Sequence, residues 1–246
     1  MNACLVLGLP SVSPTMQKIS CILLAFTLVS CSSYVTPGRQ ADLSTFTNPS
    51  VKKAFVAKPA IKFPANIALV RVQEGGYRSE STTSQGQGAY SVVTSRDIEN
   101  EADIETSANL PGVDNVVTLN RLLLPKNLSS DLDLREAAAK LQADAILLYT
   151  ISTDFRDDDL IPPLTVLSLS ILSTSKYRIQ STASAILMDT KTGYIYGALE
   201  EASDKQGVDF IFNGSDVARK KAERTALDKL LASFDPFWRR IYSKYR

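Results

Sequence analysis

The sequence contains no histidine, and its three cysteines (Cys4, Cys21 and Cys31) all lie within the first 31 residues. Histidine is the commonest general base and metal ligand, and a thiolate is the nucleophile of cysteine enzymes. We therefore expect the chain beyond Cys31 to hold no disulfide, no metal site and no cofactor, and the protein not to be an enzyme. Catalysis by carboxylates alone stays open, although no pair of them is supported by its spacing.

An excess of charge of one sign is also missing, because 27 Lys and Arg residues stand against 26 Asp and Glu residues. Binding to nucleic acid needs a positive excess that neutralises phosphates. We therefore expect no nucleic-acid partner. With 246 residues, of which 44% are hydrophobic, the chain is long enough to bury the core of one domain or of two small ones.

A long apolar run is missing as well. The run Ile19–Val29 follows Lys18 and is shorter than the roughly 20 apolar residues that a transmembrane helix needs. A basic start, a short apolar stretch and small residues before a cut are typical of a secretory signal, which we predict over residues 1–30. Residues 1–15 contain no basic residue, so we also hypothesise that translation starts at Met16.

The predicted signal ends in Leu28-Val29-Ser30-Cys31, which resembles the lipobox of bacterial lipoproteins. The resemblance implies that Cys31 receives a diacylglycerol and an N-acyl chain such as palmitate. Together these chains would anchor the protein permanently in membrane lipid. By the sorting rules of such lipoproteins, the non-acidic Ser32 favours the periplasmic side of the outer membrane. The alternative is an ordinary signal in which Cys31 is incidental.

Residues 31–60 are rich in Ser, Thr and Pro and show no sustained apolar period. This composition predicts a flexible tether behind the lipidated cysteine, which spans roughly 30 Å as a coil and about 100 Å when extended. Residues 61–246 are expected to form one periplasmic domain with a basic C-terminal helix.

Hydrophobic periodicity predicts the elements of that domain. We expect strands at 67–70, 116–119, 145–149, 177–188 and 194–199, and helices at 96–107, 133–141 and 216–233. Residues 73–89 are expected to form a mobile loop, and Pro236 is expected to end the last helix. The order β-α-β-α-β-β-β-α predicts a single α/β (α+β) domain with a mixed sheet, in which strands joined by a helix run parallel.

Two stretches of this pattern resemble known families. Ala143–Leu148, then Ala185–Gly193 and a terminal Ala-rich helix, are similar to the α/β domain of three groups of proteins. These are the curli-secretion-channel lipoproteins, the penicillin-binding-protein-activator lipoproteins and the N-terminal domain of the Tol-Pal β-propeller protein. Leu110–Gly112, with Leu119–Pro125, more specifically resembles the rhombotarget lipoproteins. The resemblance implies a periplasmic binding or assembly factor, or a pore, without catalytic residues.

The segment Leu160–Leu172 is apolar and too short for a membrane helix. One interpretation is a buried strand or a loop packed against the sheet. The other is an exposed apolar patch that contacts a partner, a sister subunit or the bilayer. The candidate contact residues are Leu160, Leu164, Val166, Leu167, Leu169 and Ile171.

The C-terminal stretch 219–246 combines basic residues with aromatic ones, and Trp238, Arg239 and Arg240 are its candidate contact residues. Aromatic residues and Arg suit a protein interface or an anionic headgroup surface. The alternative is an amphipathic cap that buries Phe237 and Trp238 and leaves its basic side in water.

Taken together, these features predict a non-enzymatic envelope lipoprotein that binds or assembles an unidentified envelope protein. The alternative is a self-assembling ring or secretion-pore component that uses residues 160–172.

Overall fold

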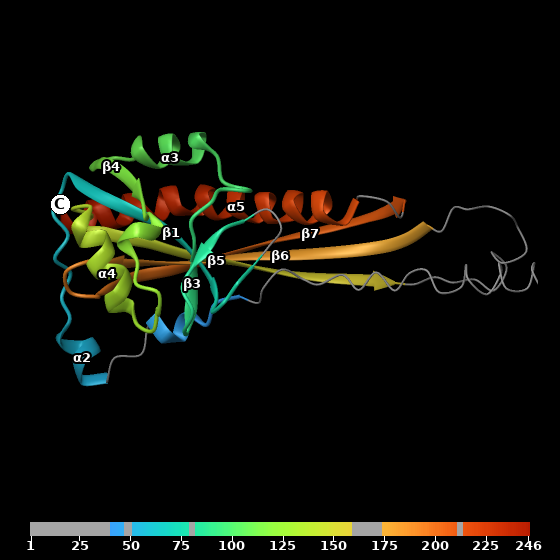
Figure 1. The fold of residues 1–246 in the computed structure, drawn as a ribbon. Helices are drawn as coiled ribbons and strands as arrows, with labels where there is room; N and C mark the ends of the chain where they lie inside the picture. Colours follow the sequence, from blue (N-terminus) through green and yellow to red (C-terminus); the bar gives the residue numbers. More distant parts are fainter. Residues whose placement is uncertain (1–39, 47–50, 79–81, 159–173, 211–213) are drawn as a thin grey trace, which may run out of the picture. The chain divides into compact units, whose positions relative to one another are not determined.

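The computed structural model describes residues 40–46, 51–78, 82–158, 174–210 and 214–246, and Figure 1 shows their fold. The strands are β1 (Ala65–Glu74), β2 (Ser84–Gln85), β3 (Tyr90–Val93), β4 (Val113–Thr118), β5 (Ala145–Asp158), β6 (Thr174–Asp189) and β7 (Ile195–Phe210). The helices are α2 (Val51–Val56), α3 (Glu101–Ala108), α4 (Asp131–Lys140) and α5 (Gly214–Tyr245), with short 3-10 turns η1 (Leu43–Phe46) and η2 (Arg121–Leu123). All of these strands belong to one sheet, so the predicted mixed α/β class is confirmed.

The sheet has the order β2-β3-β1-β5-β6-β7, and β4 pairs with the first half of β1. β1 runs parallel to both β4 and β5, with Ile67 opposite Val116 on one side and Ala145 on the other. The two strand-helix-strand connections therefore join parallel strands, as the sequence predicted. The second half of β1 pairs with β3 in antiparallel fashion.

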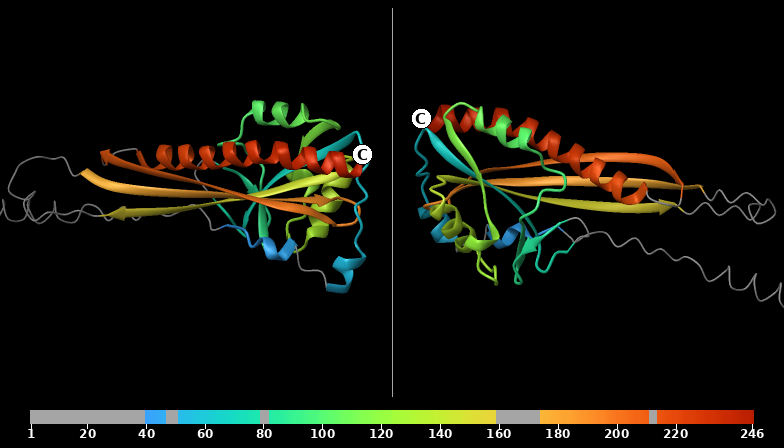
Figure 2. Two further views of the ribbon diagram at one scale, coloured as in Figure 1. Left: turned by 180° about the vertical axis from the view of Figure 1, so that it is seen from behind. Right: turned by 45° about the horizontal axis from the view of Figure 1, so that its top comes forward.

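Helices cover both faces of the sheet, as the two views in Figure 2 show. Successive side chains of β1 point to opposite faces of the sheet, so alternate residues pack against different helices. Ile67 joins the core beneath α5, whereas Ala68 and Val70 join the core beneath α4. On α4, the residues Leu134, Ala137 and Ala138 are buried at helical spacing. The predicted start of this helix was late, since Ser130 caps it and the Asp133 side chain accepts from the Ser130 backbone N–H.

β5, β6 and β7 form an antiparallel set of long strands. β5 stays paired with β6 from Ala145↔Asp189 to Asp158↔Lys176, and β6 stays paired with β7 as far as Thr174↔Phe210. The β6–β7 hairpin turns at Asp189, whose Oδ1 accepts from the backbone N–H groups of Lys191 and Thr192 at 2.9 Å each. The predicted hairpin is confirmed, although β7 is longer than the expected strand at 194–199.

The prediction that Pro236 ends the last helix was wrong, because α5 continues through Pro236 to Tyr245. A proline inside a helix costs about 3 kcal/mol through its missing N–H. Here the turns around Pro236 bury Phe234, Phe237 and Trp238. Each such side chain contributes about 1.5–3 kcal/mol on burial, and together they outweigh the cost of the proline. In the described part of the chain, neither α5 nor any other helix has the length and hydropathy for crossing a membrane.

Two strands were missed in the region from which a mobile loop was expected. β2 lies inside the predicted loop 73–89 and β3 directly follows it. The glycines of this region interrupt the hydrophobic alternation by which strands are predicted. In the structure, Tyr90 and Val92 are buried beneath α4, and β3 pairs with β1 through Val92↔Val72. The expected helix 96–107 is shorter in the structure, because Asn100 caps α3 and fixes its start.

The expected tether also needs correction, because described residues between 40 and 60 belong to the domain. The Ala41 side chain is buried, and its N–H donates to Thr150 Oγ1 at 3.2 Å. Gln40 donates to Ser184 at 3.2 Å, and the Ala60 N–H donates to Asp189 Oδ2 at 2.7 Å. Small apolar side chains such as Ala41 fill gaps in a core without any sustained period, so periodicity missed them.

Candidate functional sites

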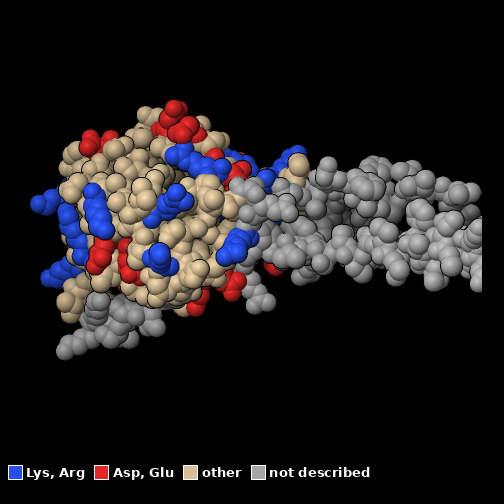
Figure 3. All heavy atoms as spheres, in the orientation of Figure 1, with Lys and Arg blue, Asp and Glu red and all other residues tan. Residues whose placement is uncertain are grey.

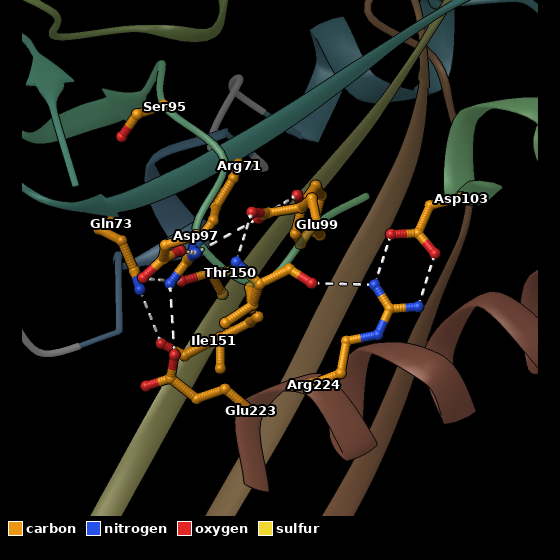
Figure 4. Close-up of polar contacts among 12 residues, drawn as sticks. Arg71, Gln73, Ser95, Asp97, Glu99, Asp103, Thr150, Ile151, Glu223 and Arg224 are labelled. Carbon is orange, nitrogen blue, oxygen red and sulfur yellow. Dashed lines mark hydrogen bonds and ion pairs between the residues drawn. The ribbon is translucent and has the colours of Figure 1, made fainter. Parts of the chain in front are cut away.

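A buried ion network lies between the sheet and α5, and Figure 4 shows its central residue, Arg71, with the acidic partners Asp97, Glu99 and Glu223. Its centre is Arg71 on β1, whose side chain is 2% exposed. Arg71 Nη1 lies 2.9 Å from Asp97 Oδ1 and 3.3 Å from Glu99 Oε1, and Nη2 lies 3.8 Å from Glu223 Oε2 on α5. Strand alternation turns Arg71 toward α5, on the same face as Ile67.

Further polar groups extend the network on both sides of Arg71. Glu223 Oε1 accepts from Arg219 Nη1 at 2.8 Å and from Thr153 Oγ1 at 3.0 Å. The Tyr149 hydroxyl donates to Glu99 Oε1 at 2.7 Å. The network thus joins β1, β5 and α5 to the loop that leads into α3.

The acidic groups around Arg71 keep its guanidinium ionised. Burial alone would lower the pKa of the Arg71 guanidinium, but Glu99 and the other acidic groups beside it outweigh burial and raise that pKa. Burial, followed by the charge of Glu99, raises the pKa of Tyr149 well above its ordinary value. Arg71 therefore stays charged, and the Tyr149 hydroxyl stays protonated as a donor.

A second ion pair ties α3 to α5. Arg224 Nη2 lies 2.7 Å from Asp103 Oδ1, and Arg224 Nη1 also donates to the Ile98 backbone carbonyl at 2.9 Å. Burial of Asp103 opposes ionisation, but the hydrogen bonds from Arg224 and from the Asn100 backbone N–H, with the charge of Arg224, lower its pKa below the ordinary 3.8. The folded state therefore favours the ionised form of Asp103.

This lowered pKa predicts how acid acts on stability. Stability from a carboxylate with a lowered pKa is present above its unfolded value of 3.8 and is lost as the pH falls through the folded value. Asp103→Asn should cost about 1–3 kcal/mol at neutral pH, since it weakens a charged hydrogen bond. It should also lose less stability than the native protein on acidification below about pH 4.

Urea midpoints at neutral and acidic pH measure both effects. The matched control is Asp228→Asn, because Asp228 pairs with the same Arg224 but its side chain is 55% exposed. If native protein and Asp103→Asn lost equal stability on acidification, the ion pair would not be the cause.

The geometry of the network suits a structural role. The cavity beside it, lined by Leu69, Arg71, Glu99 and Tyr149 among others, has a volume of about 40 Å³. Each water molecule needs roughly 10–15 Å³, so only a few molecules of that size fit. Within the described ranges, the acidic residues form no group that is suited to a metal ion. The network therefore fixes α3 and α5 to the sheet and, in this geometry, has no space for a substrate.

Sequence reasoning missed this network. One signal was available, because Arg71 interrupts the apolar run that begins at Ile67. A charged residue inside a run that is otherwise apolar on both faces indicates a buried partner. Its partners could not be named from the sequence, since Glu223 lies more than 150 residues further along the chain.

The residues predicted to contact a partner do not all lie in the described part of the structure, and one of them is buried. Cys31 and the residues of the apolar segment (Leu160, Leu164, Val166, Leu167, Leu169 and Ile171) lie outside the described residues. Trp238 is a core residue and not a surface contact, because it is 0% exposed. Its ring lies 5.8 Å from that of Phe63, and its Nε1 donates to the Pro111 carbonyl at 2.9 Å. The burial of Phe237 and Trp238 is the part of the cap interpretation that the structure confirms.

The two arginines after Trp238 remain at the surface. Arg239 pairs with Asp235 one helical turn earlier, and both side chains are about half exposed. Arg240 lies over the ring of Phe237, 5.8 Å from its centre. The same helix end therefore buries its aromatic face and exposes its cations.

Comparison with known proteins gives only weak likenesses. No family model matches this chain, and no curated protein matches it. Among solved structures, a dodecamer of a PelC variant from Paraburkholderia phytofirmans is 11% identical, covers 71% of this chain and 93% of its own, and has a TM-score of 0.26. Lipoprotein GNA1162 from Neisseria meningitidis is 12% identical over 69% of this chain and 99% of its own, with a TM-score of 0.28.

The hypothetical protein CT253 from Chlamydia trachomatis is 13% identical over 72% of this chain and 95% of its own, with a TM-score of 0.28. With TM-scores this low, the three likenesses do not indicate a function for this chain. The neighbours include one that is described as a lipoprotein. The resemblance to the rhombotarget family stays a prediction.

Proposed function

We propose that this protein is a lipoprotein of the bacterial outer membrane, anchored through Cys31, whose domain binds another envelope protein without catalysing a reaction. The anchor is supported by the lipobox-like Leu28–Cys31 at the end of a signal-like run. The absence of histidine and the Arg-paired acids of the buried network support a binding role over catalysis.

The position of the ends of β5 and β6 supports the proposal that residues 160–172 contact the partner. The chain leaves β5 at Asp158 and enters β6 at Thr174, next to the pair Asp158↔Lys176. This is the end of β6 opposite to the hairpin at Asp189, and among the β6 side chains whose burial the structure describes, Ile179 is the core residue nearest to it. An apolar sequence that connects two strands at the outer end of a sheet is well placed to meet a partner.

Crosslinking in living cells tests this proposal. A photoreactive residue at position 167, in the full precursor tagged after Arg246, should give a specific adduct in the outer-membrane fraction. The matched control is the same residue at position 122, because Leu122 is an apolar side chain that is 85% exposed on the described surface. Adducts at 167 and none at 122 are expected. The absence of an adduct at 167, with the protein in the outer membrane, would overturn the proposed contact.

Self-assembly into a ring or pore is the second candidate function, and the free edge of the sheet favours it. Among the described strands, β7 pairs with β6 alone, so one side of this 16-residue strand has no strand partner. Such an edge can pair with another chain. Lys229 Nζ covers one carbonyl of this strand by donating to Ala202 O at 2.6 Å. A crosslinked adduct with the mass of two copies would favour self-assembly over a different partner.

A further inference from the structure

Several exposed cations lie at the end of the domain where the C-terminus lies, and Figure 3 shows Lys and Arg along this edge, with a few acidic side chains among them. We define this basic end by Lys58, Lys62, Lys140, Lys191, Arg240, Lys244 and Arg246, all of which are exposed. Contacts show that these segments meet. The Tyr196 ring of the β6–β7 hairpin lies 5.4 Å from that of Tyr245, and its hydroxyl accepts from the Ile61 N–H at 3.2 Å.

Much of this positive charge faces water. Lys244 and Arg246 lie over the rings of Tyr245 and Tyr242, at 5.0 and 5.6 Å from the ring centres. Aromatic rings position these cations without neutralising their charge. Lys191 does pair with Asp144 at 3.3 Å, but its side chain remains 59% exposed. The basic end therefore keeps a positive surface that complements an anionic one.

Exposed apolar side chains lie at the same end. Phe55 and Val56 on α2 are 86% and 69% exposed, and Lys58 follows them. All three views in Figures 1 and 2 place α2 at the end that carries the C-terminus. Exposed Phe and Val beside lysines are typical of segments that lie in the headgroup region of a membrane, with the apolar groups inserted and the amines outside.

The attachment of the N-terminal segment sets how far this end can lie from the anchor. The Gln40 side chain donates to Ser184 of β6, and Gln40 is the ninth residue after Cys31. Nine residues span at most about 30 Å. Ser184 precedes the turn at Asp189 by five residues, or about 17 Å along the strand. The basic end thus lies within reach of the bilayer that holds the lipidated Cys31.

We propose that the basic end docks on anionic phospholipid headgroups of the bilayer that holds the anchor. The proposal rests on the lipid anchor of the proposed function. The anchor supplies affinity, and the basic end sets the orientation of the domain. Because headgroups are held at high local concentration, weak charge attraction is enough for docking. The hairpin at Asp189 belongs to the basic end, and Thr174 lies at the other end of β6. Docking therefore directs the ends of β5 and β6 near Asp158 and Thr174 away from the lipid.

Amine labelling of the lipidated protein in vesicles tests this proposal. Vesicles of phosphatidylcholine alone are compared with vesicles that also contain phosphatidylglycerol, and a water-soluble amine reagent is read out by peptide mass spectrometry. Labelling of Lys58, Lys62, Lys140, Lys191 and Lys244 should fall about fivefold or more in the anionic vesicles. Labelling of the exposed Lys126 and Lys221 should stay constant, because Lys126 lies beside the β2–β3 connection, where its carbonyl accepts from the Gln87 N–H, and Lys221 lies in the first turns of α5, far from its C-terminal end. High salt should restore the labelling.

A charge-reversed variant, Lys140→Glu with Lys244→Glu, should return the other lysines of the basic end to the labelling seen on neutral vesicles. Its matched control, Lys126→Glu with Lys221→Glu, has the same net charge and should keep the protection. Equal labelling of both lysine groups on anionic vesicles would overturn the docking proposal. Failure of the anchor is distinguishable, because the Cys31 peptide would then lack the mass of its lipid.

Discussion

Replacing Arg71 with Met is expected to lower the free energy of unfolding by about 3–5 kcal/mol. The substitution keeps much of the side-chain volume but removes the positive charge. Asp97, Glu99 and Glu223 would then lie buried without the guanidinium that all three contact. The cost comes from the loss of this shared countercharge beside buried acids, although Glu223 keeps its ion pair with Arg219.

Urea unfolding measures this effect, with the emission of Trp238 as the probe. Trp238 is the single tryptophan of the chain and is 0% exposed, so its environment changes on unfolding. The matched control is Arg178→Met. Arg178 pairs with Asp204 at 2.9 Å, but both side chains are about half exposed. Pairs of this kind contribute about 0–1 kcal/mol. Equal losses in the two variants would refute the special role of the buried network.

Truncation of Trp238 to Ala is expected to cost about 3–5 kcal/mol, because it leaves a cavity where α5 meets the segment before β1. The indole packs against Phe63 and Phe234, with ring centres 5.8 and 6.0 Å away. Its loss also leaves the Pro111 carbonyl without the indole N–H that donates to it. Circular dichroism is the suitable measurement, since the variant has no tryptophan.

Phe55→Ala is the control for this truncation. Phe55 is also a large aromatic residue, but it is 86% exposed. Its removal should change the free energy of unfolding by about 0.5 kcal/mol or less. A Trp238→Ala variant as stable as the Phe55→Ala variant would show that the last turns of α5 are not part of the cooperative core.

The elements that the sequence predicted well are those whose signal is local. The helix at α4 was visible through the spacing of Leu134, Ala137 and Ala138, all of which are buried. The β6–β7 hairpin was visible through the alternation over Tyr177–Met188 and the turn residues Asp189–Gly193 that follow it. Period and turn chemistry act over a few residues, and a single sequence contains them in full.

The errors have a common physical cause, which is tertiary packing that overrides a local signal. Pro236 is a local helix breaker, yet burial of Phe237 and Trp238 keeps α5 continuous. Ala41 has no periodic context, yet it fills the core beneath α4. β3 lies beside Gly-rich sequence, yet its pairing with β1 makes it a strand. In each case the stabilising contact comes from residues far away in the chain.

By itself, the sequence determined the fold class, the lack of histidine and of cysteine beyond Cys31, and the lipobox-like end of the signal-like run. These features follow from composition and from contiguous residues. Only the tertiary structure decided that Arg71 meets Glu223, that Trp238 is buried, and that cations from separate segments form one basic end. The reason is that such contacts depend on the register of the sheet and the path of α5, which arise from the packing of the whole domain.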